Sequence, residues 1–309
     1  MASPYASRYR TIINIVRLGR PRFLWLGISL YLLGALLAMA SGAAFSADRF
    51  VFGYLVLVTG QLSVHYSNVY FDYKADSMTQ SGALSGGSRI LQKHPDLRPF
   101  ALWPGLSLAV LSVVLGAVFT IVYAFPPEYA GLVIFGNLLG WCYAAPPVRL
   151  AYRGPGEIAT MIAVGFLMPG IGNFSQCRAF SPLFMIFSVP LLLYSLSFII
   201  NVEVPDLEGD RAGGRNNFIA NKGRAFGFTV IGLLTALATA YLAILSLVPY
   251  SFDFRPVLLF SFVPLLPALY GLMKKPHERE MALKLVQINV GCYLLLILLI
   301  NAYLTYIQL

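Results

Sequence analysis

The sequence predicts an all-α, polytopic membrane protein, and its composition, its apolar runs and the placement of its basic residues support this prediction. Of its 309 residues, 58% are hydrophobic and only 11% are charged, which leaves too few polar side chains to cover a soluble globule. A helix needs roughly 20 mostly apolar residues to cross a hydrocarbon layer about 30 Å thick. The chain contains nine runs that approach this length.

These nine runs are expected to form the spans of a single membrane-embedded domain, residues 1–309, in which the helices surround a central cavity. An odd number of spans places the two chain termini on opposite sides of the membrane. The predicted spans lie near residues 22–43, 50–70, 100–123, 130–146, 156–174, 181–202, 225–249, 254–273 and 284–307.

The distribution of Lys and Arg predicts the orientation, because short loops rich in these residues remain in the cytoplasm. If the N-terminus is cytosolic, all but three of the 22 Lys and Arg residues fall on the cytosolic side, and the exceptions are Arg49, Arg178 and Arg255. We therefore expect a multi-pass protein of the cytoplasmic membrane. Two long cytosolic loops, about 72–99 and 203–224, are expected to cap the cavity.

The net charge of +9 follows mostly from this topology. The basic face would attract anionic lipid headgroups and phosphorylated substrates, whereas a nucleic-acid partner is not expected. Cys142, Cys177 and Cys292 are far apart and form no C-x-x-C pair. We interpret them as packing residues rather than as a metal or redox centre.

Two polar clusters stand at the cytosolic ends of the second and sixth spans. The first cluster is Asn68, Asp72 and Asp76, and the second is Glu203, Asp206 and Asp210. Steps of four residues turn a helix by about 400°, so the members of the first cluster share one helix face. The second cluster has a 3-then-4 spacing and shares a face for the same reason.

Carboxylates at the edge of a low-dielectric bilayer are costly unless a cation offsets them. Mg²⁺ prefers carboxylate oxygens and fills its other positions with water and phosphate oxygens. Two facing clusters would therefore hold a diphosphate through Mg²⁺. Basic side chains on the same face can also bind phosphate oxygens directly. They are Arg20, Arg22, Lys74, Arg89, Arg149, Arg153 and Arg215.

The alternative is that these acids only form salt bridges with the same basic residues at the membrane surface. Two clusters at corresponding places, each followed by a Gly-rich basic loop, favour the metal site. Pro205 either bends the helix or marks its end. The stretch from Tyr143 to Glu157 is either a rigid turn or a source of phosphate-binding arginines and a phenol.

Four motifs follow one another along the chain. They are Asn68-Val-Tyr-Phe-Asp72-Tyr-Lys-Ala-Asp76, then Ser85-Gly-Gly-Ser-Arg-Ile-Leu91, then Tyr143 to Glu157, then Glu203-Val-Pro-Asp206-Leu-Glu208-Gly-Asp210. In this order they resemble the motifs of the UbiA-type membrane prenyltransferases, and the resemblance covers nearly the whole chain. The branch that the chain resembles most contains the 1,4-dihydroxy-2-naphthoate polyprenyltransferases and their archaeal relatives.

The resemblance implies Mg²⁺-dependent transfer of a polyprenyl group from polyprenyl diphosphate to an aromatic acceptor, such as 1,4-dihydroxy-2-naphthoate in menaquinone-type quinone synthesis. It implies that the NxxxDxxxD and DxxxD motifs bind the metal and that Glu203 assists them. The residues expected to act in catalysis are Asp72, Asp76, Asp206, Asp210 and Tyr143. Those expected to bind the diphosphate are Asn68, Arg20, Lys74, Arg89, Arg149 and Arg153.

Several alternatives stay open at this point. The acceptor could be a glyceryl phosphate, as in archaeal ether-lipid synthesis. A cation-coupled transporter would also place acids in membrane helices, although here they cluster at one face. The proton that the acceptor loses could go to Tyr143, to Asp72 or to the released diphosphate. Two departures from the usual motifs are Ala151, where a basic residue is common, and Arg215-Asn216-Asn217, which replaces Lys-Arg-Thr.

Overall fold

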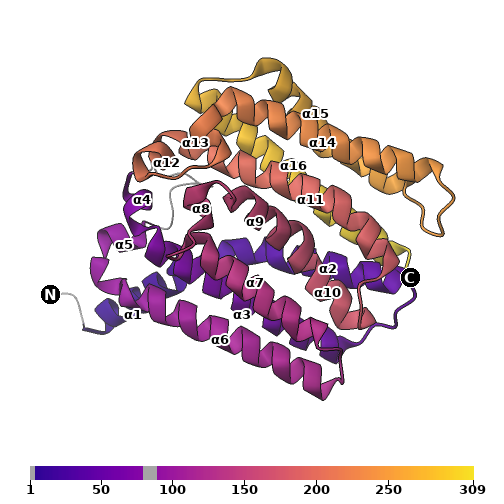
Figure 1. Cartoon of the computed structure of the whole chain (residues 1–309), viewed down its shortest axis with the longest axis horizontal. Coiled ribbons are helices and arrows are strands. Elements are labelled where there is room, and N and C mark those ends of the chain that lie inside the picture. Colours follow the sequence, from indigo (N-terminus) through magenta and orange to yellow (C-terminus); the bar gives the residue numbers. More distant parts are fainter. Residues whose placement is uncertain (1–3, 79–88) are drawn as a thin grey trace.

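The computed structural model describes residues 4–78 and 89–309, and all regular elements in these residues are helices. The long helices lie side by side in one bundle (Figure 1). The Ser85-Gly-Gly-Ser88 part of the second motif, like the rest of residues 79–88, lies outside the described residues.

Nine helical units of membrane length occupy the described part of the chain, and each coincides with one predicted span. They are α2 (Leu24–Ala40), α3 (Ala47–Phe71), α6 (Pro99–Val122), α7 (Glu128–Ala144), the consecutive α9 (Gly156–Ile162), π-helical η3 (Ala163–Leu167) and α10 (Met168–Cys177), α11 (Pro182–Glu203), α14 (Arg224–Leu247), α15 (Arg255–Lys274) and α16 (Arg279–Tyr306).

Seven of the helical stretches in the described residues are both long and apolar enough to cross a membrane. The units α7 and α3 are not among them. Helix α7 has only 17 residues. Helix α3 carries Gln61, His65 and Asn68, whose polar side chains lower its hydropathy and face an internal cavity. The chain is an integral, multi-pass membrane protein.

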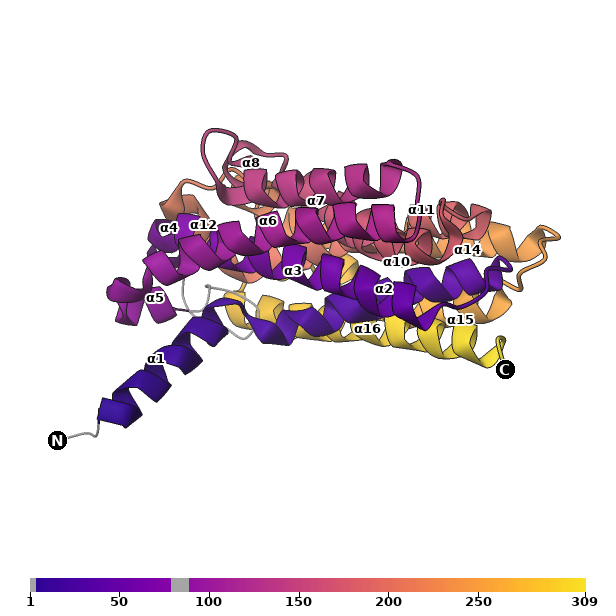
Figure 2. The same ribbon diagram turned by 90° about the horizontal axis from the view of Figure 1, so that it is seen from below.

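The short helices gather at one end of the bundle, here called the cap end (Figures 1 and 2). They are α1 (Pro4–Leu18), η1 (Pro21–Phe23), α4 (Tyr73–Met78), α5 (Ile90–Lys93), η2 (Pro95–Leu97), α8 (Leu150–Arg153), η4 (Val204–Asp206), α12 (Leu207–Gly213) and α13 (Phe218–Lys222). The C-terminus lies at the opposite end, as an odd number of spans requires.

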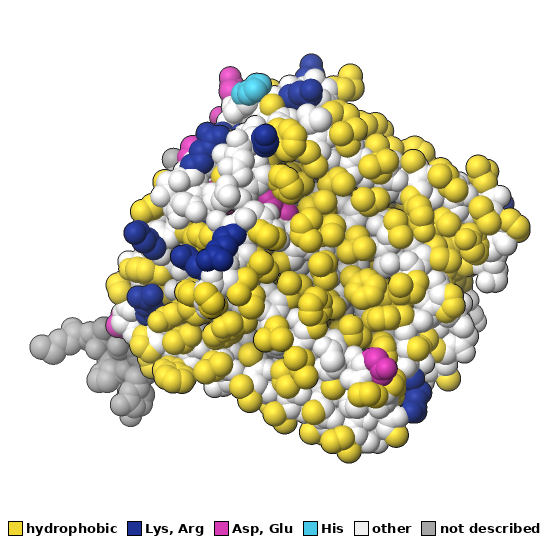
Figure 3. Space-filling view, in the orientation of Figure 1, with side chains coloured by type: hydrophobic (Ala, Val, Ile, Leu, Met, Phe, Trp, Pro, Cys, Tyr) yellow, Lys and Arg dark blue, Asp and Glu magenta, His cyan; other side chains and the backbone are white. Residues whose placement is uncertain are grey.

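The outer surface is apolar between the two ends (Figure 3). Large side chains such as Ile121, Leu237 and Leu259 are exposed on it, and a surface of this kind is stable only in contact with lipid or another apolar partner. Many Lys and Arg side chains gather toward the cap end. Arg49 and Arg255, two of the three basic residues predicted on the other side, lie in the first turns of α3 and α15, at the opposite end.

Helices α2 and α10 cross with their backbones in close contact. A Cβ atom on Gly34 would lie 1.7 Å from the carbonyl oxygen of Pro169, and one on Gly172 would lie 2.0 Å from that of Tyr31. The hydrophobic effect does not drive association between helices in lipid. Small residues at such crossings let the backbones approach closely, so that van der Waals packing holds the helices together. This crossing fixes η3 and α10 as a wall of the internal cavity.

We predict that Gly172→Ala lowers the stability of the bundle by about 1–3 kcal/mol, because the added methyl group overpacks the crossing of α2 and α10. The matched control is Gly291→Ala in α16, where a Cβ atom would meet nothing within 4 Å. Thermal unfolding of the detergent-solubilised variants measures the difference. An unchanged or raised melting temperature for Gly172→Ala would contradict this account of the packing.

Candidate active site

The first carboxylate cluster lies where α3 meets α4. Helix α3 ends at Phe71 and Asp72 forms its C-cap, so the continuous helix expected over this cluster is interrupted at one residue. The backbone N–H of Asp76 nevertheless donates to the carbonyl of Asp72 at 2.8 Å. This i to i+4 bond keeps the two aspartates one turn apart, and both are buried.

The second cluster lies where α11 meets α12. Helix α11 ends at Glu203, and a 3₁₀ turn that contains Pro205 leads into α12, so the proline marks a bend between two helices. Helix α12 places Asp210 in a buried position. It ends at Gly214, whose φ of +74° suits glycine, and the N–H of Arg215 then donates to the carbonyl of Asp210 at 2.9 Å.

Arg215 joins the two clusters. Its Nη2 lies 2.7 Å from Asp72 Oδ2 and 3.9 Å from Asp76 Oδ1. Its Nη1 lies 3.4 Å from Asp210 Oδ1. Helices α4 and α12 are in contact at this point, since a Cβ on Gly213 would lie 2.9 Å from Ala75 Cβ. We call this group of one guanidinium and three carboxylates the arginine hub.

Two further side chains hold the hub in place. The hydroxyl of Tyr152 on α8 donates to Asp72 Oδ1 at 2.8 Å. The amide of Asn217 donates to Asp210 Oδ2 at 2.6 Å, while its oxygen accepts from the N–H of Ala220 at 2.6 Å and caps α13. The sequence alone assigned neither residue to the carboxylates. Tyr152 is 80 residues from Asp72 in the chain, and the turn at Gly214 separates Asn217 from Asp210.

The electrostatics of the hub follow from its burial. Burial alone would lower the pKa of Arg215, but the carboxylates of Asp72 and Asp210 outweigh it and raise the pKa well above its ordinary value. Burial, followed by the negative charge of Asp72, raises the pKa of Asp76 to about 6. Burial and the same carboxylate raise the pKa of Tyr152 to about 12. The guanidinium is therefore a permanent cation, and the phenol remains a hydrogen-bond donor.

The other predicted site residues lie at different distances from the hub. Arg20 joins its edge, with Nη2 3.8 Å from Asp76 Oδ2. Glu203 is buried, and its Oε2 has no hydrogen-bond partner within the described residues. Asp206 ends the turn between α11 and α12. Lys74 and Arg153 are exposed and form none of the ion pairs of the hub.

Arginine also precedes two short helices of the cap. Arg89 and Arg149 are the N-cap residues of α5 and α8, and both have positive φ values, of 52° and 49°. The guanidinium of Arg149 lies 3.9 Å from the centre of the Tyr152 ring, so it stacks on the phenol that contacts Asp72. Arg149 is thereby close to the hub.

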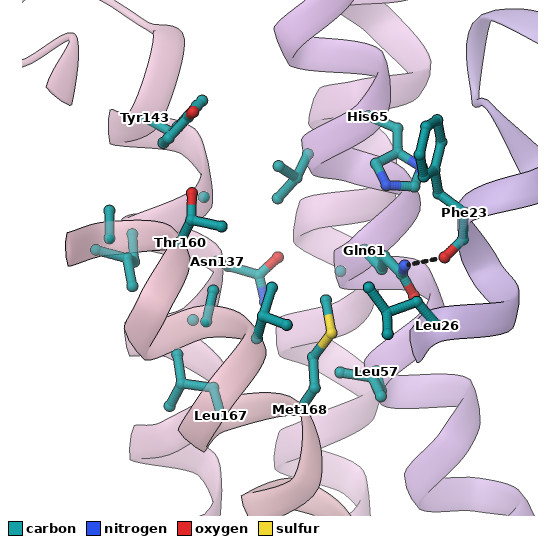
Figure 4. A pocket seen from close by; sticks show the side chains of 18 of the residues that line it. Phe23, Leu26, Leu57, Gln61, His65, Asn137, Tyr143, Thr160, Leu167 and Met168 are labelled. Carbon is teal, nitrogen blue, oxygen red and sulfur yellow. Dashed lines mark hydrogen bonds between the residues drawn. The ribbon is translucent and has the colours of Figure 1, made fainter. Parts of the chain in front are cut away.

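A cavity of about 310 Å³ lies between α2, α3, α7, the α9–α10 unit and α11. Its lining includes Asn68 and Arg20, so it opens beside the hub. Figure 4 shows Tyr143 and His65 on facing walls at one end of the cavity, and Leu57, Leu167 and Met168 toward the other end. The cavity therefore has a polar region near the cap and an apolar interior, which suits a ligand with a charged head and a hydrocarbon tail.

The oxygen donors fit a hard divalent cation such as Mg²⁺. No group of three or more His, Cys, Asp or Glu side chains is arranged as a ready metal site in the described residues. Such an ion needs only one or two protein carboxylates when phosphate and water supply its other ligands. The buried oxygens Asn68 Oδ1 and Glu203 Oε2 have no hydrogen-bond partner in the described part of the chain. In the same region, the Arg215 guanidinium forms ion pairs with Asp72 and Asp210, so a cation already lies between these carboxylates.

Comparison with known proteins finds relatives that are named as prenyl- or phytyltransferases. The chain is 24% identical over 188 residues to 1,4-dihydroxy-2-naphthoate octaprenyltransferase of Bacillus subtilis, and the match covers 61% of this chain and 58% of that protein. The match thus spans little more than half of the relative's length.

Solved structures extend the likeness to the whole bundle. A UbiA homologue from Archaeoglobus fulgidus bound to GPP and Mg²⁺ has a TM-score of 0.65 at 18% identity, covering 94% of this chain and 99% of that chain. A structure of a digeranylgeranylglyceryl phosphate synthase in membranes has a TM-score of 0.66 at 16% identity, covering 95% and 99%. At these identities the likeness establishes the fold.

The sequence also matches a family model described as the UbiA prenyltransferase family. Because this model extends over residues 28–306, from within α2 to the last residue of α16, the chain belongs to the UbiA prenyltransferase family.

Proposed function

We propose that this protein transfers a polyprenyl group from polyprenyl diphosphate to an aromatic acceptor in the membrane, with Mg²⁺ as cofactor. The acceptor that we favour is a precursor of menaquinone-type quinones such as 1,4-dihydroxy-2-naphthoate. The single observation that carries the proposal is the position of the arginine hub beside the mouth of an apolar cavity. A diphosphate head at the hub and an isoprenoid tail in the cavity match these two environments.

The residues of the hub explain how the allylic C–O bond could break. Mg²⁺, when bound by the two aspartate motifs, would stabilise negative charge on the diphosphate leaving group. Arg215 and Arg20 already lie at the carboxylates and can turn their N–H groups toward phosphate oxygens. The apolar walls exclude water that would otherwise quench the allylic cation. The acceptor then attacks the allylic carbon and loses a proton.

The acceptor class rests on the relatives. Similarity to the naphthoate octaprenyltransferase of Bacillus subtilis supports a quinone precursor. Similarity of fold to the digeranylgeranylglyceryl phosphate synthase makes a glyceryl phosphate the second candidate. The transporter alternative is less well supported, because the buried acids of the hub gather at one end of the bundle and pair with an arginine there.

The membrane orientation completes the proposal. The cap end carries most of the basic residues, so it faces the cytosol of a cell membrane. A soluble, charged diphosphate can reach the hub from that side, while the prenyl chain and the product remain in the bilayer. Anionic lipids would accompany the basic cap.

The reaction is tested by incubating membranes that contain the protein with Mg²⁺, a labelled polyprenyl diphosphate and a panel of acceptors. We expect a prenylated 1,4-dihydroxy-2-naphthoate derivative, identified by mass, and no product when the metal is chelated. A prenylated glyceryl phosphate instead would support the second candidate. Flux of cations into liposomes with no prenylated product from any acceptor would overturn the proposal.

We predict that Asp72→Asn and Asp210→Asn each reduce prenyl transfer about 100-fold or more, because each removes a charge from the metal site but keeps the shape of the side chain. Protein abundance in membranes should change little. The control is Glu280→Gln, which removes an exposed carboxylate that pairs only with Lys284. Undiminished turnover in both aspartate variants would exclude the hub as the reaction centre.

We predict that Arg215→Gln makes the protein depend on Mg²⁺ for stability. Three buried carboxylates lose their cation in this variant, and an uncompensated buried charge costs about 3–5 kcal/mol. The melting temperature should therefore rise more with added Mg²⁺ in Arg215→Gln than in the wild type. Lys284→Gln, which loses an exposed charge, should respond as the wild type does. Equal Mg²⁺ responses in all three proteins would argue against the shared role of arginine and metal.

A further inference from the structure

We propose that His65, on the wall of the cavity, accepts a hydrogen bond from a hydroxyl group of the aromatic acceptor. This inference rests on the proposed prenyl transfer and adds a residue that recognises the acceptor. His65 lies on α3 and lines the cavity, and Figure 4 shows it on the wall opposite Tyr143.

The hydrogen bond of His65 fixes its tautomer. Nδ1 lies 2.8 Å from the carbonyl oxygen of Gly19. A carbonyl can only accept, so Nδ1 carries the hydrogen and donates it. In the neutral ring Nε2 is then an acceptor with a free lone pair. Phe23 packs edge-on against the ring, with 6.1 Å between centroids, and this contact holds its orientation.

The position of His65 along α3 places it at the depth of the reaction. It lies three residues before Asn68 and seven before Asp72, so all three share one helix face. With a rise of about 1.5 Å per residue, His65 is roughly 4.5 Å below Asn68 along the axis. The allylic carbon is bonded to the diphosphate and must lie just below the hub. An acceptor within attacking distance, about 3–3.5 Å, therefore lies next to His65.

The chemistry of His65 selects its ligand. Nε2 accepts a hydrogen bond, so the matching ligand group is a donor such as a phenolic hydroxyl. Much of the cavity lining is apolar, which suits an aromatic ring. We therefore expect a hydroxylated aromatic ring to bind with one hydroxyl group toward His65.

The test compares hydroxyl recognition in the wild type, His65→Asn and His65→Gln. Asparagine can still donate to the Gly19 carbonyl but lacks an atom at the Nε2 position, whereas glutamine places an amide there. The ligands are 1,4-dihydroxy-2-naphthoate and its two monomethyl ethers, whose dissociation constants are measured by competition in the prenyl-transfer assay and by calorimetry without prenyl diphosphate.

We expect one ether to bind the wild type roughly tenfold more weakly than the parent, because a buried acceptor loses its donor. This penalty should vanish in His65→Asn and persist in His65→Gln, with the KM for polyprenyl diphosphate unchanged. An ether penalty that is absent in the wild type, or equal in His65→Asn, overturns the inference. Failure of the wild type to prenylate any acceptor would instead refute the proposed function.

Discussion

The fold depends on one electrostatic constraint, which is that three carboxylates are buried at the edge of a bilayer and need positive charge. Asp72, Asp76 and Asp210 come from two separate parts of the chain, and Arg215 forms an ion pair with each of them. Removing a buried charge from its partner costs several kcal/mol. One guanidinium therefore holds the two cap segments together through three carboxylates, and in the proposed function a metal ion and a diphosphate take its place.

The segment that carries Arg215 is anchored from several sides. Arg224, at the start of α14, forms two hydrogen bonds with Glu208 on α12, at 2.8 and 2.6 Å. Glu157, at the start of α9, accepts the backbone N–H of Phe218. Asn217 links Asp210 to α13. These bonds fix the backbone on both sides of Arg215, so an exchange of partners requires a movement of its side chain alone.

Much of the fold could be predicted because lipid imposes a simple rule on sequence. Each span must be apolar and about 20 residues long, so the nine runs predicted the long helices. These include α3, whose polar residues lower its hydropathy, and α7, which has only 17 residues. The spacing of Asp72 and Asp76 predicted that they lie one turn apart, whereas the 3₁₀ turn at Pro205 interrupts the helix expected over the second cluster. Two details were missed locally: the helix break at Asp72 and the π-helical turn Ala163–Leu167, which depend on tertiary packing rather than on residue type.

The candidate site could be predicted only in part, because its contacts join distant segments. The sequence indicated that Arg215 and Tyr152 lie on the cap face, yet not that both would meet Asp72, which is 80 residues from Tyr152 in the chain. His65 gave no motif, and its role depends on a carbonyl 46 residues away. Lys74 and Arg153 were predicted beside the diphosphate from their side of the membrane alone, and both are exposed in the structure. Whether they bind phosphate stays a prediction.

The most direct measurement is an experimental structure of the protein with Mg²⁺ and a non-hydrolysable polyprenyl diphosphate analogue. We predict that the metal lies between the two aspartate motifs and that the Arg215 guanidinium has left Asp72 and Asp210 for phosphate oxygens, with the hydrocarbon tail beside Leu57 and Met168. A structure in which Arg215 keeps its three carboxylates while metal and diphosphate bind elsewhere would contradict it.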